Sequence, residues 1–415
     1  MTSDQPSNRT KRVRCCIVGG GPAGMMLGYL LGRAGIEVVV LEKHADFFRD
    51  FRGDTVHPST LQVMDELGLI DGFLKLPHQR LQKLDGLFGG TPVRIADLSR
   101  LHTKYPFIAF MPQWDFLNFL REAGGRFASL EMMMNTEAVD LIRRGETIAG
   151  VRATTPDGIV DIEADLTIAC DGRHSTVRER AGLAVEEIGA PMDVLWFRAG
   201  RKADETENVF ARVEPGKMMI TFDRGDYWQC AYVIAKGQYE AVKARGLQAL
   251  LDDVVRMAPI LKAGIADVKS FDDVKLLTVA INRLTRWTRP GLLCIGDAAH
   301  AMSPVGGVGV NLAVQDAVAT ANLLADKLQQ GCPSEDELDA VRRRREFPVK
   351  MTQWMQRVVQ NNIISGALYG GDQPLKVPLI VRLITALPWL QGIPARLIGL
   401  GVRPEHVQSK VAARS

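Results

Sequence analysis

A short glycine-rich turn between two apolar segments is the feature that most constrains how this chain can fold. Residues 14–18 form a mainly apolar run that ends abruptly in glycine, and residues 22–34 then carry apolar side chains at helical spacing. Residues 36–41 form a second apolar run. Strand, glycine turn, helix and strand within about 30 residues are typical of a βαβ unit. The pattern therefore predicts an α/β fold built on a buried parallel sheet.

The glycines of this turn have the spacing of a dinucleotide-binding fingerprint. Gly19, Gly21 and Gly24 follow the pattern Gly-x-Gly-x-x-Gly, with Pro22 and Ala23 before the last glycine. The three glycines would allow a tight turn, a close approach of pyrophosphate to the backbone, and close packing of helix on strand. The phosphates would then lie at a helix N-terminus, where free amides favour anions. Taken alone, the turn fits NAD, NADP or FAD.

An acidic residue closes the fingerprint. Glu42 ends the second apolar run, where a carboxylate needs hydrogen-bond donors, and the diol of a ribose supplies two. Lys43, like its neighbours His44 and Arg49, is a candidate contact to a cofactor phosphate, with an ordinary surface charge as the alternative.

Two later segments have the same relation to a buried strand. Residues 166–170 are largely apolar and are followed by Asp171-Gly172. Residues 291–295 are followed by Gly296-Asp297 and then by the glycine-rich segment 304–311. Because the carboxyl ends of parallel strands meet at one edge of a sheet, we expect all three motifs to lie at that edge, where such folds bind ligands.

The remaining pattern predicts more than one structural unit. Residues 186–280 contain strand-like runs separated by Pro-Gly and Arg-Gly-Asp turns, as in an antiparallel sheet. We therefore predict an α/β fold with a Rossmann-type layer, an interleaved antiparallel-sheet substrate domain, and a helical C-terminal region. The predicted parts are a disordered tail at 1–12, the nucleotide-binding layer at 13–80, 106–185 and 281–330, the substrate domain at 81–105 and 186–280, and the helical region at 331–415.

Composition excludes several classes of protein. The net charge of +3 is small and the basic residues are spread along the chain, so nucleic acid is not an expected partner. The six cysteines lack metal-ligand spacing, which predicts buried thiols and neither a metal site nor disulfides. The N-terminus has no apolar core and no apolar run reaches about 18 residues, so neither a signal sequence nor a membrane span is expected. These features predict a cytoplasmic protein.

The three motifs, in this order over residues 14 to 330, resemble the class A flavoprotein monooxygenases, the family of para-hydroxybenzoate hydroxylase. The resemblance implies FAD as the cofactor, with its pyrophosphate at the glycine turn and its adenosine ribose at Glu42. It also implies that the glycine-rich loop borders the flavin ring and that Asp297 binds the ribityl chain. The FAD contacts implied beyond the glycine turn are Arg52, Gln113, Asp171, Gly172, Asp297, Pro304, Gly307, Gly309, Val310 and Asn311.

The resemblance also implies a reaction. NADPH or NADH would bind transiently and reduce FAD, dioxygen would add to give a flavin hydroperoxide, and an oxygen atom would pass to an aromatic or related small-molecule substrate. A pocket between flavin and sheet would include Tyr227, Gln229 and His57, and Tyr227 or His57 could relay a proton from a phenolic substrate. The alternatives are that Tyr227 packs structurally and that His57 caps the following helix.

The apolar C-terminal stretch 377–402 leaves other possibilities open. It could cover the substrate domain, form a homodimer contact in place of a monomer, or make peripheral contact with a membrane. A membrane contact would suit a hydroxylase or reductase of a lipophilic isoprenoid or quinone-type substrate. A halogenase is disfavoured because the string from Trp389 to Pro394 lacks the second tryptophan of its motif. A flavin-binding partner protein without catalytic activity is the remaining alternative.

Overall fold

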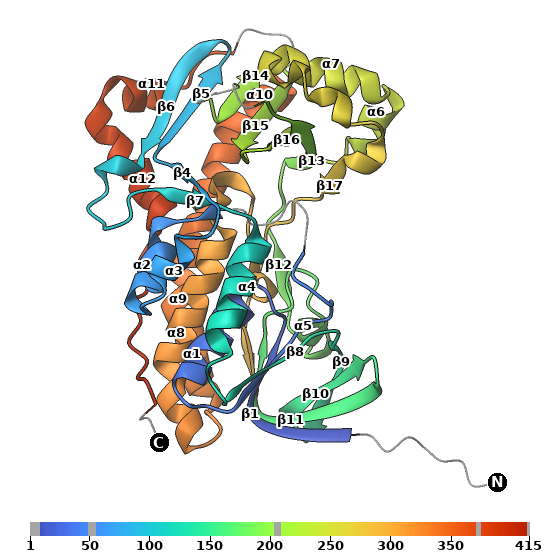
Figure 1. Ribbon diagram of the computed structural model, residues 1–415, viewed down its shortest axis with the longest axis vertical. Helices are drawn as coiled ribbons and strands as arrows, with labels where there is room; N and C mark the ends of the chain where they lie inside the picture. Colours follow the sequence, from blue (N-terminus) through green and yellow to red (C-terminus); the bar gives the residue numbers. More distant parts are fainter. Residues whose placement is uncertain (1–8, 49–54, 203–208, 371–374, 413–415) are drawn as a thin grey trace, which may run out of the picture.

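The computed structural model describes residues 9–48, 55–202, 209–370 and 375–412. Two layers lie end to end in Figure 1, with the main sheet and its helices below and a second sheet above. The two described ends of the chain both lie in the lower layer.

The main sheet has the strand order β19-β20-β11-β1-β2-β8, and β10 and β9 extend it beside β11. Its central strands β20, β11, β1, β2 and β8 are all parallel, which confirms the predicted βαβ unit. The strands are β1 (Arg9–Val18), β2 (Val38–Leu41), β8 (Leu130–Met133), β9 (Glu137–Arg144), β10 (Thr147–Thr155), β11 (Gly158–Ala169), β19 (Thr288–Arg289) and β20 (Leu292–Cys294).

The first strand begins earlier than expected. Residues 9–12 belong to β1 and pair in parallel register with residues 160–163 of β11, so the prediction of a disordered tail through residue 12 is wrong for these four residues. Two basic side chains of this extension have charged partners: Arg9 pairs with Asp157 and Lys11 with Glu131. The long β11 offers an unpaired edge that these residues satisfy.

Helices cover the main sheet and supply most of its core. α1 packs against α4 and α8, and α8 packs against α9 (Figure 1). Within the described residues, one helical segment, Val305–Gln330, is long and apolar enough to cross a membrane, but 83% of its most apolar window is buried in this core. The helices of this layer are α1 (Pro22–Arg33), α2 (Pro58–Glu66), α3 (Ile70–Phe73), α4 (Gln113–Gly124), α5 (Thr176–Arg180), α8 (Gly309–Gln330) and α9 (Glu335–Val359).

The second sheet has the order β17-β13-β16-β15-β14-β5-β6. Its pairs are antiparallel except β14 with β5, in agreement with the predicted antiparallel-sheet domain. Residues 239–257 form two helices, because Gly246 adopts a φ of +87° between them. The elements are β5 (Lys83–Phe88), β6 (Thr91–Asp97), β13 (Met192–Gly200), β14 (Ala211–Glu214), β15 (Lys217–Asp223), β16 (Tyr227–Ala235), β17 (Lys275–Leu277), α6 (Tyr239–Ala244) and α7 (Leu247–Met257).

Two three-stranded sheets join the layers, with the orders β3-β7-β4 and β12-β18-β21. The C-terminal region serves both layers: α11 and α12 lie against β6, whereas the Ala412 amide donates to the Arg33 carbonyl at the end of α1. The remaining elements are β3 (Thr55–Val56), β4 (Gln79–Leu81), β7 (Ile108–Phe110), β12 (Val185–Glu187), β18 (Asn282–Leu284), β21 (His300–Ala301), α10 (Ser365–Tyr369), α11 (Leu379–Ala386) and α12 (Gly392–Gly399).

Candidate functional site

The three motifs meet at the carboxyl edge of the main sheet, as their positions after parallel strands predict. The Gly19 amide donates to Leu41 O at 2.8 Å, and the Cys170 amide donates to Val18 O at 2.7 Å. The Ile295 amide donates to Ala169 O at 3.0 Å. The ends of β1, β2, β11 and β20 are thereby tied together at the point where the strand order reverses, which is the ligand-binding crevice of such sheets.

The glycine turn has the geometry that its spacing predicts. Gly19 has a φ of +107°, and a Cβ there would lie 2.4 Å from Cys170 O. A Cβ at Gly24 would lie 1.9 Å from Gly19 O, so α1 crosses β1 too closely for any side chain. At Gly21, in contrast, no protein atom lies within 4 Å of the Cβ position. Pro22 begins α1 and no side chain caps it, which leaves the first amides of the helix available to an anion.

Glu42 closes this turn. Its Oε2 accepts from the Gly20 amide at 3.1 Å, and its Oε1 accepts from the His44 amide at 3.0 Å. The carboxylate is therefore held beside the turn at the end of β2, where a ribose would also meet it. Lys43 lies 3.7 Å from Glu137 in an ion pair whose side chains are both more than half exposed. Arg49 and Arg52 lie outside the described residues.

Two aspartates face the same edge. Asp171 Oδ2 accepts from the Val177 amide at 3.1 Å, while its buried Oδ1 has no hydrogen-bond partner in the described part of the chain. Burial raises the pKa of Asp171, although hydrogen bonds from Ser175 and Val177 oppose this. Asp297 lies on the turn after β20, 36% exposed and 3.8 Å from Arg173 Nη2. Both carboxylates can accept from hydroxyl groups of a ligand.

The glycine-rich loop is shaped by left-handed backbone. Gly306 and Gly307 have φ values of +81° and +63°, and Thr55 Oγ1 donates to Gly307 O at 2.7 Å. Pro304 precedes the loop, and α8 begins at Gly309 and Val310 without a side-chain cap. The free amides of α8 therefore point out of the loop, as expected of a site that stabilises negative charge. Gln113, half-buried, is the first residue of α4.

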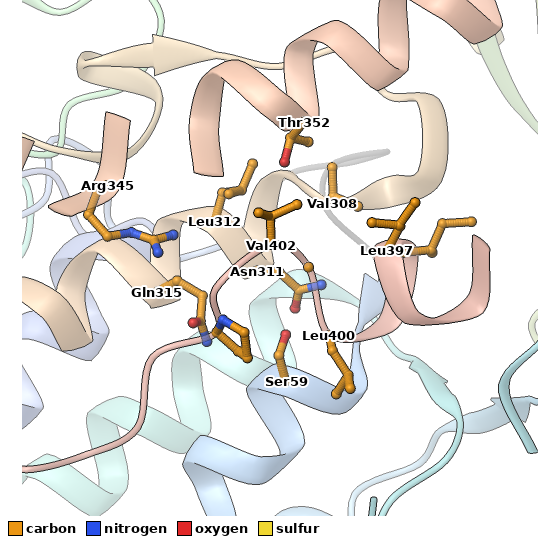
Figure 2. Close-up of a pocket in the computed structure, with 13 residues that line it drawn as sticks. Ser59, Val308, Asn311, Leu312, Gln315, Arg345, Thr352, Leu397, Leu400 and Val402 are labelled. Atoms are coloured by element: carbon orange, nitrogen blue, oxygen red, sulfur yellow. The ribbon is translucent and has the colours of Figure 1, made fainter. Parts of the chain in front are cut away.

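Asn311 has a different role from its neighbours in the loop. Its Oδ1 accepts from Thr60 Oγ1 at 2.5 Å and from the His57 amide at 3.4 Å, which clamps α8 to α2. Asn311 lines a cavity of about 20 Å³, and Figure 2 shows it between Val402 above and Ser59 and Leu400 below. Such a cavity holds about one water molecule and is too small for a flavin or a substrate.

His57 is buried and tied to the C-terminal region. Its side chain is fully inaccessible, and Nδ1 donates to Ile398 O of α12 at 2.8 Å. It precedes α2, but its side chain does not cap that helix, so the capping alternative is wrong. Burial lowers the pKa of His57 to about 4, which makes the imidazole neutral at physiological pH.

This burial predicts a pH dependence of stability. The folded pKa of about 4 lies below the ordinary value of 6.5, so below pH 6.5 the unfolded chain binds a proton that the native state refuses. The contribution of neutral His57 to the free energy of unfolding is complete above pH 6.5 and is lost as the pH falls towards 4. We expect His57→Gln to flatten this part of the stability profile in urea unfolding, whereas exposed His102→Gln keeps it. A variant with the wild-type slope would contradict this prediction.

Aromatic rings of the second sheet meet a ring of β7 close to the glycine-rich loop. Phe110 pairs with Thr55, which binds Gly307, and Trp196 packs in the same cluster as Val305 of the loop. Phe222 lies 5.1 Å from Phe110 and 6.0 Å from Trp196 between ring centroids. We define the aromatic cluster as Phe110, Trp196, Phe210 and Phe222; it joins the second sheet to β7 and lies near the loop through Thr55.

Sequence reasoning missed this cluster and chose Tyr227 and Gln229 instead. Gln229 Oε1 accepts from Arg224 Nε at 2.9 Å, and the Arg224 guanidinium lies 5.9 Å above the Phe222 ring, so Gln229 does lie beside the cluster. Tyr227 lies at the turn end of the β15–β16 hairpin, with the Arg198 guanidinium 4.8 Å above its ring. Its catalytic role stays a prediction. Period-two alternation along β13 and β15 was the signal available for Trp196 and Phe222.

A buried network of charged side chains connects α8 and α9 to the turn that follows β20. Asp316 of α8 is fully buried, and its Oδ2 accepts from the Gly296 amide at 3.0 Å and from His300 Nε2 at 2.6 Å. Arg345 Nε donates to Asp316 Oδ1 at 2.9 Å, and Arg345 also lies 3.5 Å from Glu405. Burial alone would raise the pKa of Asp316, but the His300 and Arg345 charges hold it below its usual range.

Comparison with known proteins decides the family. A family model described as an FAD binding domain matches residues 12–355. The chain is 34% identical over 375 residues to 6-methylpretetramide 4-monooxygenase of Streptomyces rimosus, covering 88% of each protein. The chain belongs to the class A flavoprotein monooxygenases. Para-nitrophenol 4-monooxygenase of a Pseudomonas species is 25% identical and is matched over 79% of this monooxygenase and 82% of its own length.

Solved structures agree with this monooxygenase in fold. The anhydrotetracycline hydroxylase OxyS of Streptomyces rimosus matches with a TM-score of 0.72 at 23% identity, over 94% of this chain and 77% of that one. The p-nitrophenol 4-monooxygenase PnpA of Pseudomonas putida matches with a TM-score of 0.73 at 21% identity, over 94% and 96%.

The edge residues of the monooxygenase fit FAD, the cofactor of its family. The open space at Gly21 leaves room for a pyrophosphate against the backbone, and the uncapped start of α1 supplies amides to it. Asp171 Oδ1 is a buried acceptor that still lacks a donor in the described chain. In the described part of the protein alone, the amides at the start of α1 have no side-chain partner and Asp171 Oδ1 has no hydrogen-bond partner. A ligand that carries phosphates and hydroxyl groups would supply these partners.

Proposed function

We propose that this monooxygenase uses NADPH or NADH and dioxygen to hydroxylate an aromatic ring of a fused, phenolic substrate. The observation that carries the proposal is the aromatic cluster beside the glycine-rich loop. Flat rings at this place suit a flat substrate, because aromatic pairs gain energy beyond burial alone. The relative named 6-methylpretetramide 4-monooxygenase supports the same substrate class.

A positive charge favours an electron-rich substrate in this position. The Arg224 guanidinium lies 5.8 Å from the Phe110 ring centroid and 5.9 Å from that of Phe222. A cation above aromatic faces would attract a phenolate or enolate oxygen of a stacked substrate. Gln229, which accepts from Arg224, would hold the guanidinium in its orientation.

The protein around the flavin has positioning tasks. Bound FAD supplies the redox and oxygen-transfer chemistry. The amides at the start of α8 would stabilise negative charge on the ring, since no protein atom lies within 4 Å of the Cβ position at Gly309. Asp297 would accept from the ribityl chain, and the loop and the aromatic cluster would exclude water from the reacting atoms.

The direct test is a screen of the FAD-loaded protein with fused phenols, simple phenols and quinone precursors. We expect fused phenols to stimulate NADPH or NADH oxidation most strongly, with a product that has gained one oxygen atom by mass spectrometry. Stimulated oxidation with hydrogen peroxide as the sole product, for every fused phenol offered, would argue against the proposal.

A substitution in the cluster tests its part in binding. We expect Phe222→Leu to raise KM for a fused aromatic substrate roughly fivefold, because a lost aromatic contact is worth about 1 kcal/mol. Tyr227→Phe is the comparison, since it keeps the ring against Arg198 and removes only the hydroxyl. If Tyr227 relays a proton, Tyr227→Phe lowers the coupling of NAD(P)H oxidation to product and leaves KM unchanged. Unchanged KM in Phe222→Leu would place the substrate elsewhere.

A second candidate is a hydroxylase or reductase of a lipophilic isoprenoid or quinone-type substrate. The exposed apolar side chains of α11 and α12 favour it, because a lipophilic substrate would be taken from a membrane surface. Dioxygen consumption matched to product separates a hydroxylase from a reductase. A cytoplasmic location and a monomeric or homodimeric state stay predictions.

A further inference from the structure

The outer surface of α11, α12 and the turn between them is unusually apolar. Six large side chains there are more than a third exposed, and they lie close together along residues 379–393. We call this surface the C-terminal patch; it consists of Leu379 (69% exposed), Ile380 (60%), Leu383 (42%), Leu387 (38%), Trp389 (68%) and Ile393 (56%).

The patch is the outer face of helices that are firmly seated. Val381 of α11 is 8% exposed and packs in a core cluster with Phe88 and Val93 of the second sheet. Thr385 Oγ1 accepts from the Arg94 amide at 3.2 Å and donates to Arg94 O at 3.3 Å. On α12, Ala395 is fully buried. The side chains of the C-terminal patch are therefore exposed in the folded protein. Exposed apolar surface of this kind marks sites of interaction with another molecule or a membrane.

The charge of this region indicates which kind of partner binds the C-terminal patch. Residues 375–404 contain four basic residues and no acidic one, although the whole chain carries a net charge of only +3. The basic residues are Lys376, Arg382, Arg396 and Arg403, all exposed. A second copy of the chain would bring the same positive charges face to face, which opposes association. An anionic surface would attract them.

We propose that the C-terminal patch docks on the surface of a bilayer that contains anionic lipids. The apolar side chains enter the boundary between headgroups and acyl chains, with Trp389 at the level that tryptophan prefers. Arg382 and Arg396 meet the lipid phosphates from the same side. The chain lies on the membrane and does not cross it. This inference stands independently of the substrate proposed above.

Vesicle co-sedimentation of the full-length, FAD-loaded protein tests the proposal. We expect binding to vesicles of phosphatidylcholine with phosphatidylglycerol, and little binding to phosphatidylcholine alone. Added salt should weaken the binding by screening. The double variant Trp389→Ser with Ile393→Ser should bind roughly tenfold more weakly or worse. Trp354→Ser on α9, where the tryptophan is 59% exposed outside the patch, should bind as the wild type does.

A charge variant separates lipid recognition from a general loss of apolar surface. Arg382→Glu with Arg396→Glu keeps the apolar side chains and should abolish the preference for phosphatidylglycerol, with flavin content reporting that the fold is intact. Absence of wild-type binding to either vesicle, or equal binding to both, would overturn the proposal. So would a dimer in sedimentation velocity that the Trp389 and Ile393 substitutions dissociate, because the occupant would then be a second copy.

Discussion

Gly21→Ala is expected to weaken FAD binding roughly ten- to hundredfold while leaving the apoprotein as stable as the wild type. The backbone at Gly21 is extended, with φ −74° and ψ −176°, which any residue adopts, and no protein atom lies within 4 Å of its Cβ position. Only a ligand pressed against this backbone would meet the added methyl group, and overpacking of this kind costs about 1–3 kcal/mol. Flavin fluorescence during titration of the apoprotein gives the affinity, and urea unfolding gives the stability.

Substitutions at two further glycines serve as controls for Gly21→Ala. Gly24→Ala places a Cβ 1.9 Å from Gly19 O, so it should destabilise the apoprotein itself. Gly366→Ala on the exposed side of α10 meets no atom within 4 Å and should leave FAD affinity unchanged. Tight FAD binding by Gly21→Ala would mean that the pyrophosphate does not approach the turn.

Arg345→Met is expected to lower the free energy of unfolding by about 3–5 kcal/mol, because it leaves the buried Asp316 carboxylate without one of its charged partners. The arginine is only 1% exposed, so water cannot replace it. Since Asp316 also holds the Gly296 amide, the variant should lose FAD more readily as well. Urea unfolding of the loaded and unloaded protein separates the two effects.

The neighbouring arginine is a matched control. Arg344 donates to Glu405 as Arg345 contacts it, but its side chain is 46% exposed, so Arg344→Met should cost about 1 kcal/mol or less. The wild-type pKa of Asp316 lies below its usual 3.8, so its charge contributes stability above that pH and less as the pH falls below it. The deficit of Arg345→Met should therefore narrow in acid. An equal deficit at Arg344 would show that Glu405, and not Asp316, carries the effect.

The cofactor edge could be predicted from the sequence because its signals are local. The turn at Gly19 to Gly24 contains its own strand and helix, and Asp171 and Asp297 each directly follow an apolar run. Parallel pairing alone then brings them to one edge. The same reasoning fails at the N-terminus, where the polar segment 9–12 looks unstructured until β11 provides a partner.

The substrate side and the supporting network could not be predicted in this way. Phe110 of β7 and Phe222 of β15 come from two different sheets, and Asp316 of α8 pairs with Arg345 of α9. A contact between segments that are distant in sequence produces no motif of fixed spacing. In the sequence, Arg345 is therefore indistinguishable from the three arginines that precede it. Tyr227 was chosen for its chemistry, whereas the pairing of β13 and β15 on either side of β16 brings the ring centroids of Trp196 and Phe222 within 6.0 Å of each other.

The interleaving of the two layers also sets the order in which the site is assembled during synthesis. β1, α1 and β2 are synthesised early, but β20, a neighbour of β11, and α8, one of the two helices that pack on α1, are synthesised much later. Gly296, Asp297 and the uncapped start of α8 are therefore missing while the whole second sheet is being made. A nascent chain that ends before β20 exposes an open edge of β11 and leaves the α8 side of α1 uncovered, both of which favour aggregation. The chain can therefore bind FAD only late in translation, after the start of α8 has been made, although the glycine turn is made much earlier.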